Sequence, residues 1–120
     1  MATRHTDRIS LTAAADLSTK QNLFAIISGD NGCNLCGAGG DAVGVILNKP
    51  VSGAAAEIGV GPRVSITLAA TLAAGAEVMS DAAGKAVAWV TANRSLGYLL
   101  EGGVANDVVS LDFEVAGRKA

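Results

Sequence analysis

The sequence has little of several residue types on which catalysis and ligand binding commonly depend. Only four of its 120 residues are aromatic, and it has a single histidine, two prolines and two cysteines. One histidine leaves little scope for Ser-His-Asp catalysis, which needs an imidazole beside its nucleophile. No G-x-S-x-G elbow occurs either. We therefore expect no catalytic residues and no cofactor, and we do not expect an enzyme.

Charge and hydropathy argue against two further classes of partner. Nine Lys and Arg face eleven Asp and Glu, and no basic block occurs. Nucleic-acid binding depends on clustered cations that neutralise phosphates, so no nucleic-acid partner is expected. The longest uncharged stretches are rich in Ala and Gly and are interrupted by polar residues, which predicts no membrane span. Residues 1–10 lack the apolar core of a signal peptide, which predicts synthesis in the cytoplasm.

Small apolar residues are abundant, with 23 Ala and 15 Gly beside many Val, Ile and Leu. A length of 120 residues predicts one domain. Small side chains bury less area than aromatic ones, and burial stabilises by about 25 cal/mol per Å². We therefore expect a modestly stable monomer that oligomerisation or docking onto a larger assembly would stabilise.

Short apolar runs alternate with turn residues along most of the chain. Strands are predicted at 23–28, 43–47, 56–60, 63–68, 77–79, 85–90, 96–100 and 108–115. The turns between them include Asn31-Gly32, Gly61-Pro62 and a hairpin loop with Gly84 at a left-handed position. About seven or eight short strands at this spacing predict a small all-β single domain, either a β-barrel or a β-sandwich. Residues 69–76 fit a two-turn helix or a connection.

Residues 1–20 differ from the rest, because they are polar at first and then lack a clear period. The alternation in residues 9–12 allows one short strand. We predict an extended N-terminal arm over residues 1–20 and a β domain over residues 21–120. An ordinary frayed terminus is the alternative interpretation.

Cys33 and Cys36 form a C-x-x-C pair, the most conspicuous local motif. A tetrahedral zinc site needs four ligands, and His5 with a carboxylate would have to complete the set. A thioredoxin-type site needs the pair at the start of a helix, whereas glycines surround this pair. We therefore predict two free thiols in a tight loop and no metal site. A metal, redox or intersubunit disulfide role is the alternative.

Five stretches, in order within residues 23–113, carry a resemblance to a known family. They are Gly44–Gly53 (GVILNKPVSG), Gly61–Val64 (GPRV), Gly75–Val87 (GAEVMSDAAGKAV), Gly97–Glu101 (GYLLE) and Asn106–Leu111 (NDVVSL). Together they resemble the capsid decoration (cement) proteins of tailed bacteriophages, in which Gly is usual at the position of Asn106. The Cys33 loop is not part of this resemblance.

The resemblance implies a structural virion protein that binds the outer surface of the phage head and stabilises the expanded capsid. Its partners would be the major capsid protein and copies of itself, often as a trimer. Binding the assembled shell in preference to its free subunits would stabilise the shell by mass action. Two alternatives are the capsid-attached base of a head fibre and a small β-barrel ligand-binding module of a cellular protein.

Interface candidates follow from residue type, since Arg and aromatic side chains are enriched at protein interfaces. They are Arg4, Arg8, Ile9 and Leu11 in the arm, together with Arg63 and Trp89. The arm would order on the shell by adding a strand to an edge of the capsid protein. Trp89 also fits a core position, because it lies within an apolar strand.

Overall fold

The computed structural model describes residues 6–90 and 94–119, and within these ranges the chain forms nine strands and no helix. This confirms the all-β prediction. None of the described residues belongs to a helix that is long and apolar enough to cross a membrane. The strands are β1 (Thr6–Ala13), β2 (Phe24–Ile27), β3 (Gly32–Leu35), β4 (Gly44–Ile46), β5 (Ala55–Thr67), β6 (Glu77–Ser80), β7 (Ala86–Ala88), β8 (Arg94–Leu99) and β9 (Val108–Lys119).

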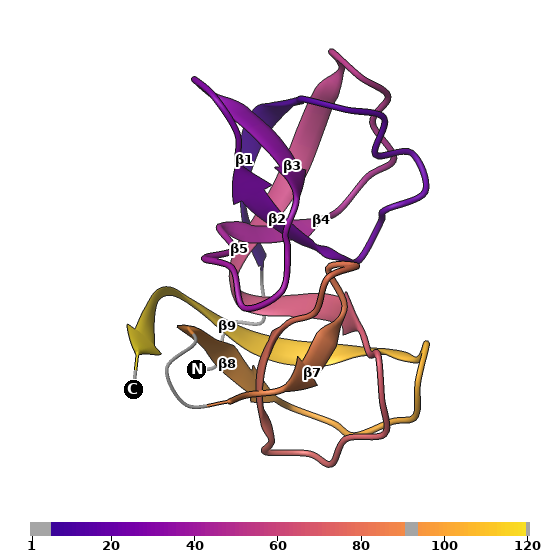
Figure 1. The fold of residues 1–120 in the computed structure, drawn as a ribbon, viewed down its shortest axis with the longest axis vertical. Helices are drawn as coiled ribbons and strands as arrows, with labels where there is room; N and C mark the ends of the chain where they lie inside the picture. The colour runs from indigo at the N-terminus through magenta and orange to yellow at the C-terminus, as the bar shows by residue number, and fades with distance from the viewer. Residues whose placement is uncertain (1–5, 91–93, 120) are drawn as a thin grey trace.

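The strands form a five-stranded barrel and a five-stranded antiparallel sheet that share β5 (Figure 1). The barrel has the order β1-β3-β2-β4-β5 and closes because β5 also pairs with β1. Among the described strand pairs of the barrel, the β1–β3 pair alone is parallel. The sheet has the order β5-β9-β8-β6-β7, and a single bridge between Leu68 and Ala86 brings its two edges together. The fold is therefore a barrel joined to a sheet.

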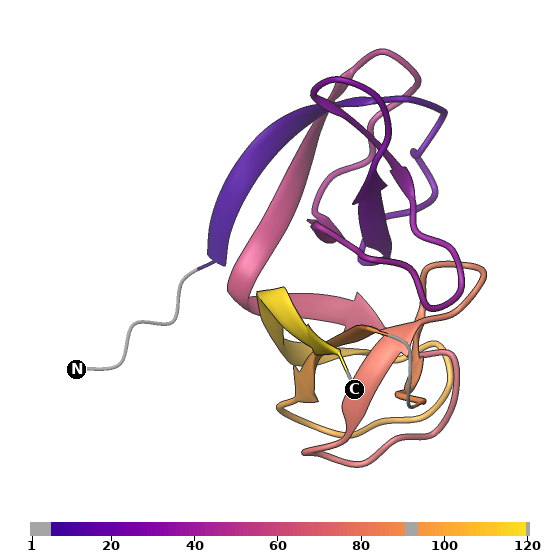
Figure 2. The same cartoon turned by 60° about the vertical axis from the view of Figure 1, so that its left-hand side comes forward.

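Strand β5 bends where it passes from the barrel to the sheet (Figure 2). A straight strand of 13 residues would span roughly 40 Å, which exceeds the molecule's longest extent of 36 Å. The register supplies the bend, because Arg8 pairs with Gly59 whereas Asp7 pairs with Gly61, which leaves Val60 as a bulge. The sequence predicts two strands broken at Gly61-Pro62. That break is wrong, because Pro62 stands where β5 changes ladders and continues as one strand.

Two hydrophobic cores fill the molecule. The smaller core lies inside the barrel and includes Ile46 and Ile58, both fully buried. The larger core lies between the sheet and the underside of the barrel, and it contains side chains from both. Phe24 from β2 and Phe113 from β9 meet there, with ring centroids 6.2 Å apart. Because the larger core takes residues from both parts, the barrel and the sheet pack as one unit.

The β6–β7 hairpin reaches up from the sheet and contacts the barrel. Its loop is organised by Asp81, whose carboxylate accepts hydrogen bonds from the N–H groups of Ala83 (2.8 Å) and Lys85 (2.9 Å). Gly84 has a φ of +80°, as the sequence predicted, and its carbonyl accepts the N–H of Phe24 at 2.8 Å. The S-D-A-A-G-K stretch therefore forms an internal contact between the two parts of the fold.

Three further sequence predictions can be compared with the fold. Residues 69–76 form a connection and no helix. Strand β3 was not predicted, and it places Cys33 on a strand where a tight loop was expected. The described part of the predicted arm is built into the barrel, since β1 pairs with β5 along its length and Leu17 is buried.

Candidate docking surfaces

Three interface candidates of the arm, Arg8, Ile9 and Leu11, lie along β1 on the barrel. The Arg8 guanidinium is exposed and pairs with the exposed Glu57 carboxylate at 2.9 Å. Exposed ion pairs contribute little to stability, so this pair mainly sets the orientation of Arg8. Ile9 is 40% exposed, whereas Leu11 packs against the barrel core. Arg4 lies outside the described residues.

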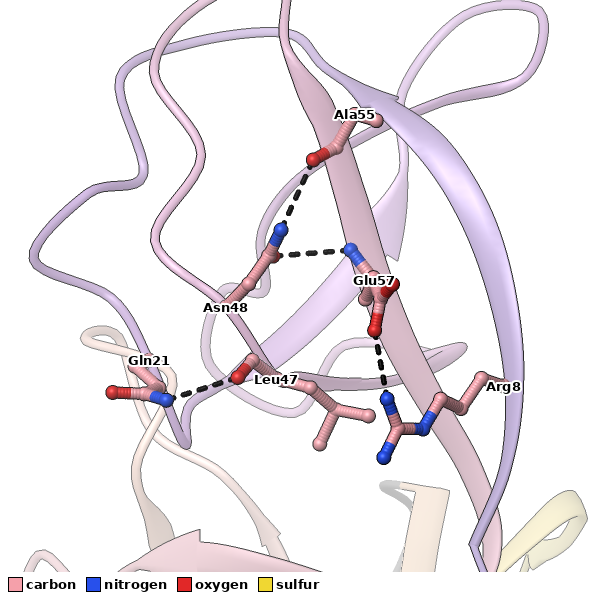
Figure 3. A network of polar contacts seen from close by, with 6 residues as sticks. All are labelled: Arg8, Gln21, Leu47, Asn48, Ala55 and Glu57. Atoms are coloured by element: carbon pink, nitrogen blue, oxygen red, sulfur yellow. Dashed lines mark hydrogen bonds and ion pairs between the residues drawn. The ribbon is translucent and has the colours of Figure 1, made fainter.

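Asn48 in the N-K-P stretch has a structural role beside this ion pair (Figure 3). Its side-chain amide donates from Nδ2 to the carbonyl of Ala55 (3.1 Å) and accepts at Oδ1 from the N–H of Glu57 (3.0 Å). The side-chain amide of Gln21 donates from Nε2 to the carbonyl of Leu47, the residue before Asn48, at 2.9 Å. The amide of Asn48 thus pairs with the edge of β5 as a neighbouring strand would, and it holds the β4–β5 connection against the barrel.

Arg63 and Trp89 lie at opposite ends of one row across the antiparallel sheet. Arg63 pairs in register with Asp112, Asp112 with Tyr98, and Tyr98 with Glu77. The N–H of Trp89 donates to the carbonyl of Glu77 at 3.0 Å. Both candidate side chains are half-buried, and the Arg63 guanidinium donates to Ser110 Oγ at 3.2 Å. Backbone pairing across the sheet therefore connects these two candidates, whereas Arg8 and Ile9 lie on the barrel strand β1.

The two cysteines are free thiols that face different cores. Cys33 is in the barrel core and Cys36 is in the larger core, and both are at most 1% exposed. Burial raises the pKa of both thiols, so neither is activated as a thiolate. No group of three or more potential ligand side chains in the described part of the chain could hold a metal ion. The described surface also has no ligand-sized pocket.

Two connections at the end of the molecule away from the barrel form a surface that the sequence analysis did not single out. We call residues 69–76 and 100–108 the lower loop surface (Figures 1 and 2). Leu72 and Gly103 exchange two backbone hydrogen bonds of 3.0 Å, which places the two connections side by side. Three large apolar side chains are exposed there: Leu100 (47%), Val104 (55%) and Val108 (51%). The sequence signal for it is the uncharged eight-residue stretch 69–76, for which the sequence predicts a helix or a connection.

The connections at the barrel end have a different character. The β2–β3 turn and the β4–β5 connection also expose large apolar residues, Ile27 (52%) and Val51 (56%). Charged residues lie close in sequence to both, namely Asp30 in the turn and Lys49 in the connection, and both are exposed. Within the described residues, the lower loop surface differs from the barrel end because it exposes three large aliphatic side chains beside the uncharged connection 69–76, although Glu101 and Asp107 also lie on it.

Among solved structures, the fold is similar to that of the head fiber gp8.5 N base in bacteriophage phi29. The TM-score is 0.71 at 13% sequence identity, and the match covers 97% of this chain and 100% of that chain. No family model and no curated protein matches the sequence. The likeness thus concerns the fold, and this chain and the phage head-fiber base share the arrangement of barrel and sheet over their full matched length.

Proposed function

We propose that this chain is a structural protein of a phage virion, attached to the outer surface of the head as the base of a head fibre. The observation that carries the proposal is the fold likeness to a phage head-fiber base, which covers 97% of this chain. The five stretches that resemble capsid decoration proteins support the same location, on the outside of the head. The major capsid protein is the proposed partner, and self-assembly into a trimer is part of the proposal.

A cement protein that stabilises the shell is the second candidate, and the ordered stretches favour it. The two candidates differ in what binding does to the shell. A cement protein binds the assembled shell and not its free subunits, so it raises the temperature at which the shell dissociates. A fibre base that contacts single capsid subunits binds the shell and the free subunits alike, so it leaves this temperature unchanged. Shell stability therefore distinguishes a cement protein that bridges subunits from such a fibre base once binding is established.

The arm is proposed to take part in attachment. On its second side β1 pairs with β3 only through Thr12 and Ala13. Among the described residues, no other strand pairs with that side of residues 6–11. A strand edge of this kind can accept an extended segment of a partner, which supports strand addition between the arm and the capsid protein.

The test uses empty expanded shells assembled from the major capsid protein encoded in the same genome. The purified chain is incubated with the shells, the mixture is sedimented, and the pellet is imaged by cryo-electron microscopy. We expect co-sedimentation and ordered density at symmetry-related sites, with an unchanged dissociation temperature for a fibre base and a raised one for a cement protein. If the folded chain stays in the supernatant, both candidate functions are wrong. Equilibrium sedimentation of the free chain measures its mass and so tests the proposed trimer.

A further inference from the structure

We propose that the lower loop surface is the face that docks on the outer surface of the head shell. This inference rests on the proposed function and names a contact with the shell that is separate from the one proposed for the β1 edge. The shell surface it fits has an apolar centre with basic groups at its rim. Rigidity, exposed apolar area and charge each support this choice.

The lower loop surface is held rigid by the backbone, although both of its segments are connections. Besides the Leu72–Gly103 pair, the N–H of Asn106 donates to the Leu68 carbonyl (2.7 Å) and the N–H of Leu68 donates to the Asp107 carbonyl (2.8 Å). A Cβ on Gly102 would lie 2.7 Å from the Leu72 carbonyl oxygen, so the two connections are in close backbone contact. A surface fixed in this way loses little conformational freedom when it binds.

The apolar side chains are concentrated on this surface. Leu100, Val104 and Val108 are three of the seven large hydrophobic side chains that the described residues expose, and they fall within nine residues. The neighbouring connection adds the exposed residues Ala70, Ala73 and Ala74 and no charge. Small side chains let a partner approach the backbone closely, and the three larger ones supply apolar area to bury.

Charge favours the shell over a second copy of the chain. The charged residues of the lower loop surface are Glu101 and Asp107, and their carboxylates are held by the N–H groups of Ser110 (3.0 Å) and Val104 (2.9 Å). Lys85 reaches the surface from the hairpin, where its Nζ donates to Asn106 Oδ1 at 2.9 Å. Two fixed carboxylates against one ammonium make the rim acidic. Contact of this surface with the same surface of a second copy would bring these carboxylates together, whereas a basic partner complements them. The trimer of the proposed function would be formed through other faces of the chain.

Equally exposed valines at the two ends allow a matched experiment. Val104→Lys and Val51→Lys place the same charge at side chains that are 55% and 56% exposed. Binding to the empty shells is measured by co-sedimentation over a range of chain concentrations. We expect Val104→Lys to weaken binding by roughly tenfold or more, because an ammonium would be buried against a basic rim, and Val51→Lys to leave it unchanged. Val104→Asp should weaken binding less than Val104→Lys.

The possible outcomes separate this inference from the proposed function. Circular dichroism establishes that each variant is folded, and Val108→Lys takes the place of Val104→Lys if that variant is not. If the wild type binds the shells and Val104→Lys binds them equally well, the lower loop surface is not the docking face, and the proposed function still stands. A Val104→Lys variant that changes the mass of the free chain in sedimentation and still binds shells would also overturn the inference. Absence of wild-type binding would overturn both.

Discussion

Replacement of Gly84 by alanine tests whether the β6–β7 hairpin is locked onto the barrel. An L-residue at the φ of +80° costs about 1–2 kcal/mol. The added Cβ would lie 2.6 Å from Leu35 Cδ1 and 3.3 Å from the Phe24 carbonyl oxygen. Overpacking of this kind costs roughly 1–3 kcal/mol. The lower entropy of the unfolded alanine chain returns about 0.4–1 kcal/mol, so we expect Gly84→Ala to lower the free energy of unfolding by roughly 2–4 kcal/mol.

The matched control is Gly53→Ala, which has a similar φ of +85° and no atom within 4 Å of the added Cβ. It carries the backbone cost without the contact, so a loss of about 1 kcal/mol is expected. Urea unfolding monitored by Trp89 fluorescence measures both variants, with the slope of the transition checked for constancy. Equal losses for the two variants would refute the contact between hairpin and barrel.

Two further predictions concern Asn48 and the buried thiols. Asn48→Ala should lower the free energy of unfolding by about 1–2 kcal/mol, because two hydrogen bonds to β5 are lost. Asn48→Asp keeps only the acceptor and should lower this free energy by less. If Asn48→Ala unfolds in urea with the stability of the wild type, the role assigned to the Asn48 amide is wrong. Because burial raises the pKa of Cys33 and Cys36, their thiols ionise more readily in the unfolded chain than in the folded one. The contribution of the thiols to the free energy of unfolding is therefore constant below the ordinary thiol pKa of 9.0 and falls as pH rises above it. Urea unfolding is measured from pH 7 to 10 for the wild type and for the Cys33→Ala, Cys36→Ala double variant. The free energy of unfolding should fall more steeply with pH for the wild type. An equal fall for the two proteins would show that the thiols are not desolvated.

Local residue chemistry predicted the strands and turns of this fold well. Gly84 adopts the left-handed conformation that its place in the hairpin loop required. Asn106, which stands where the resembling family has Gly, has a φ of +73°, a conformation that Asn tolerates better than most side chains. These features depend on a few neighbouring residues, so they are readable from a single sequence.

Features that depend on pairing between distant residues could not be read in this way. Strand β3 is short and follows a glycine-rich turn, and it forms because β2 and β1 pair with it on either side. The continuity of β5 through Pro62 depends on a bulge opposite Asp7 and Arg8. The barrel and the sheet are therefore evident only once the ladders are known.

The candidate surfaces show the same limit. Residue type alone selected Arg8, Arg63 and Trp89, which the fold distributes between the barrel strand β1 and the antiparallel sheet. The lower loop surface exists because Leu72 pairs with Gly103, thirty-one positions away along the chain. All three of its large exposed apolar side chains lie in the connection 100–108, but their exposure and their position beside the uncharged connection 69–76 follow only from the tertiary fold.

The shared strand β5 also determines how the molecule would carry a mechanical load. A pull that separates the barrel end from the sheet end is directed along the half of β5 that pairs with β1, since the strand bends before the half that pairs with β9 (Figure 2). Hydrogen bonds in antiparallel ladders lie perpendicular to the strands, so such a pull shears many of them at once and does not open them one by one. A component anchored at one end and loaded at the other would transmit tension through a single continuous strand.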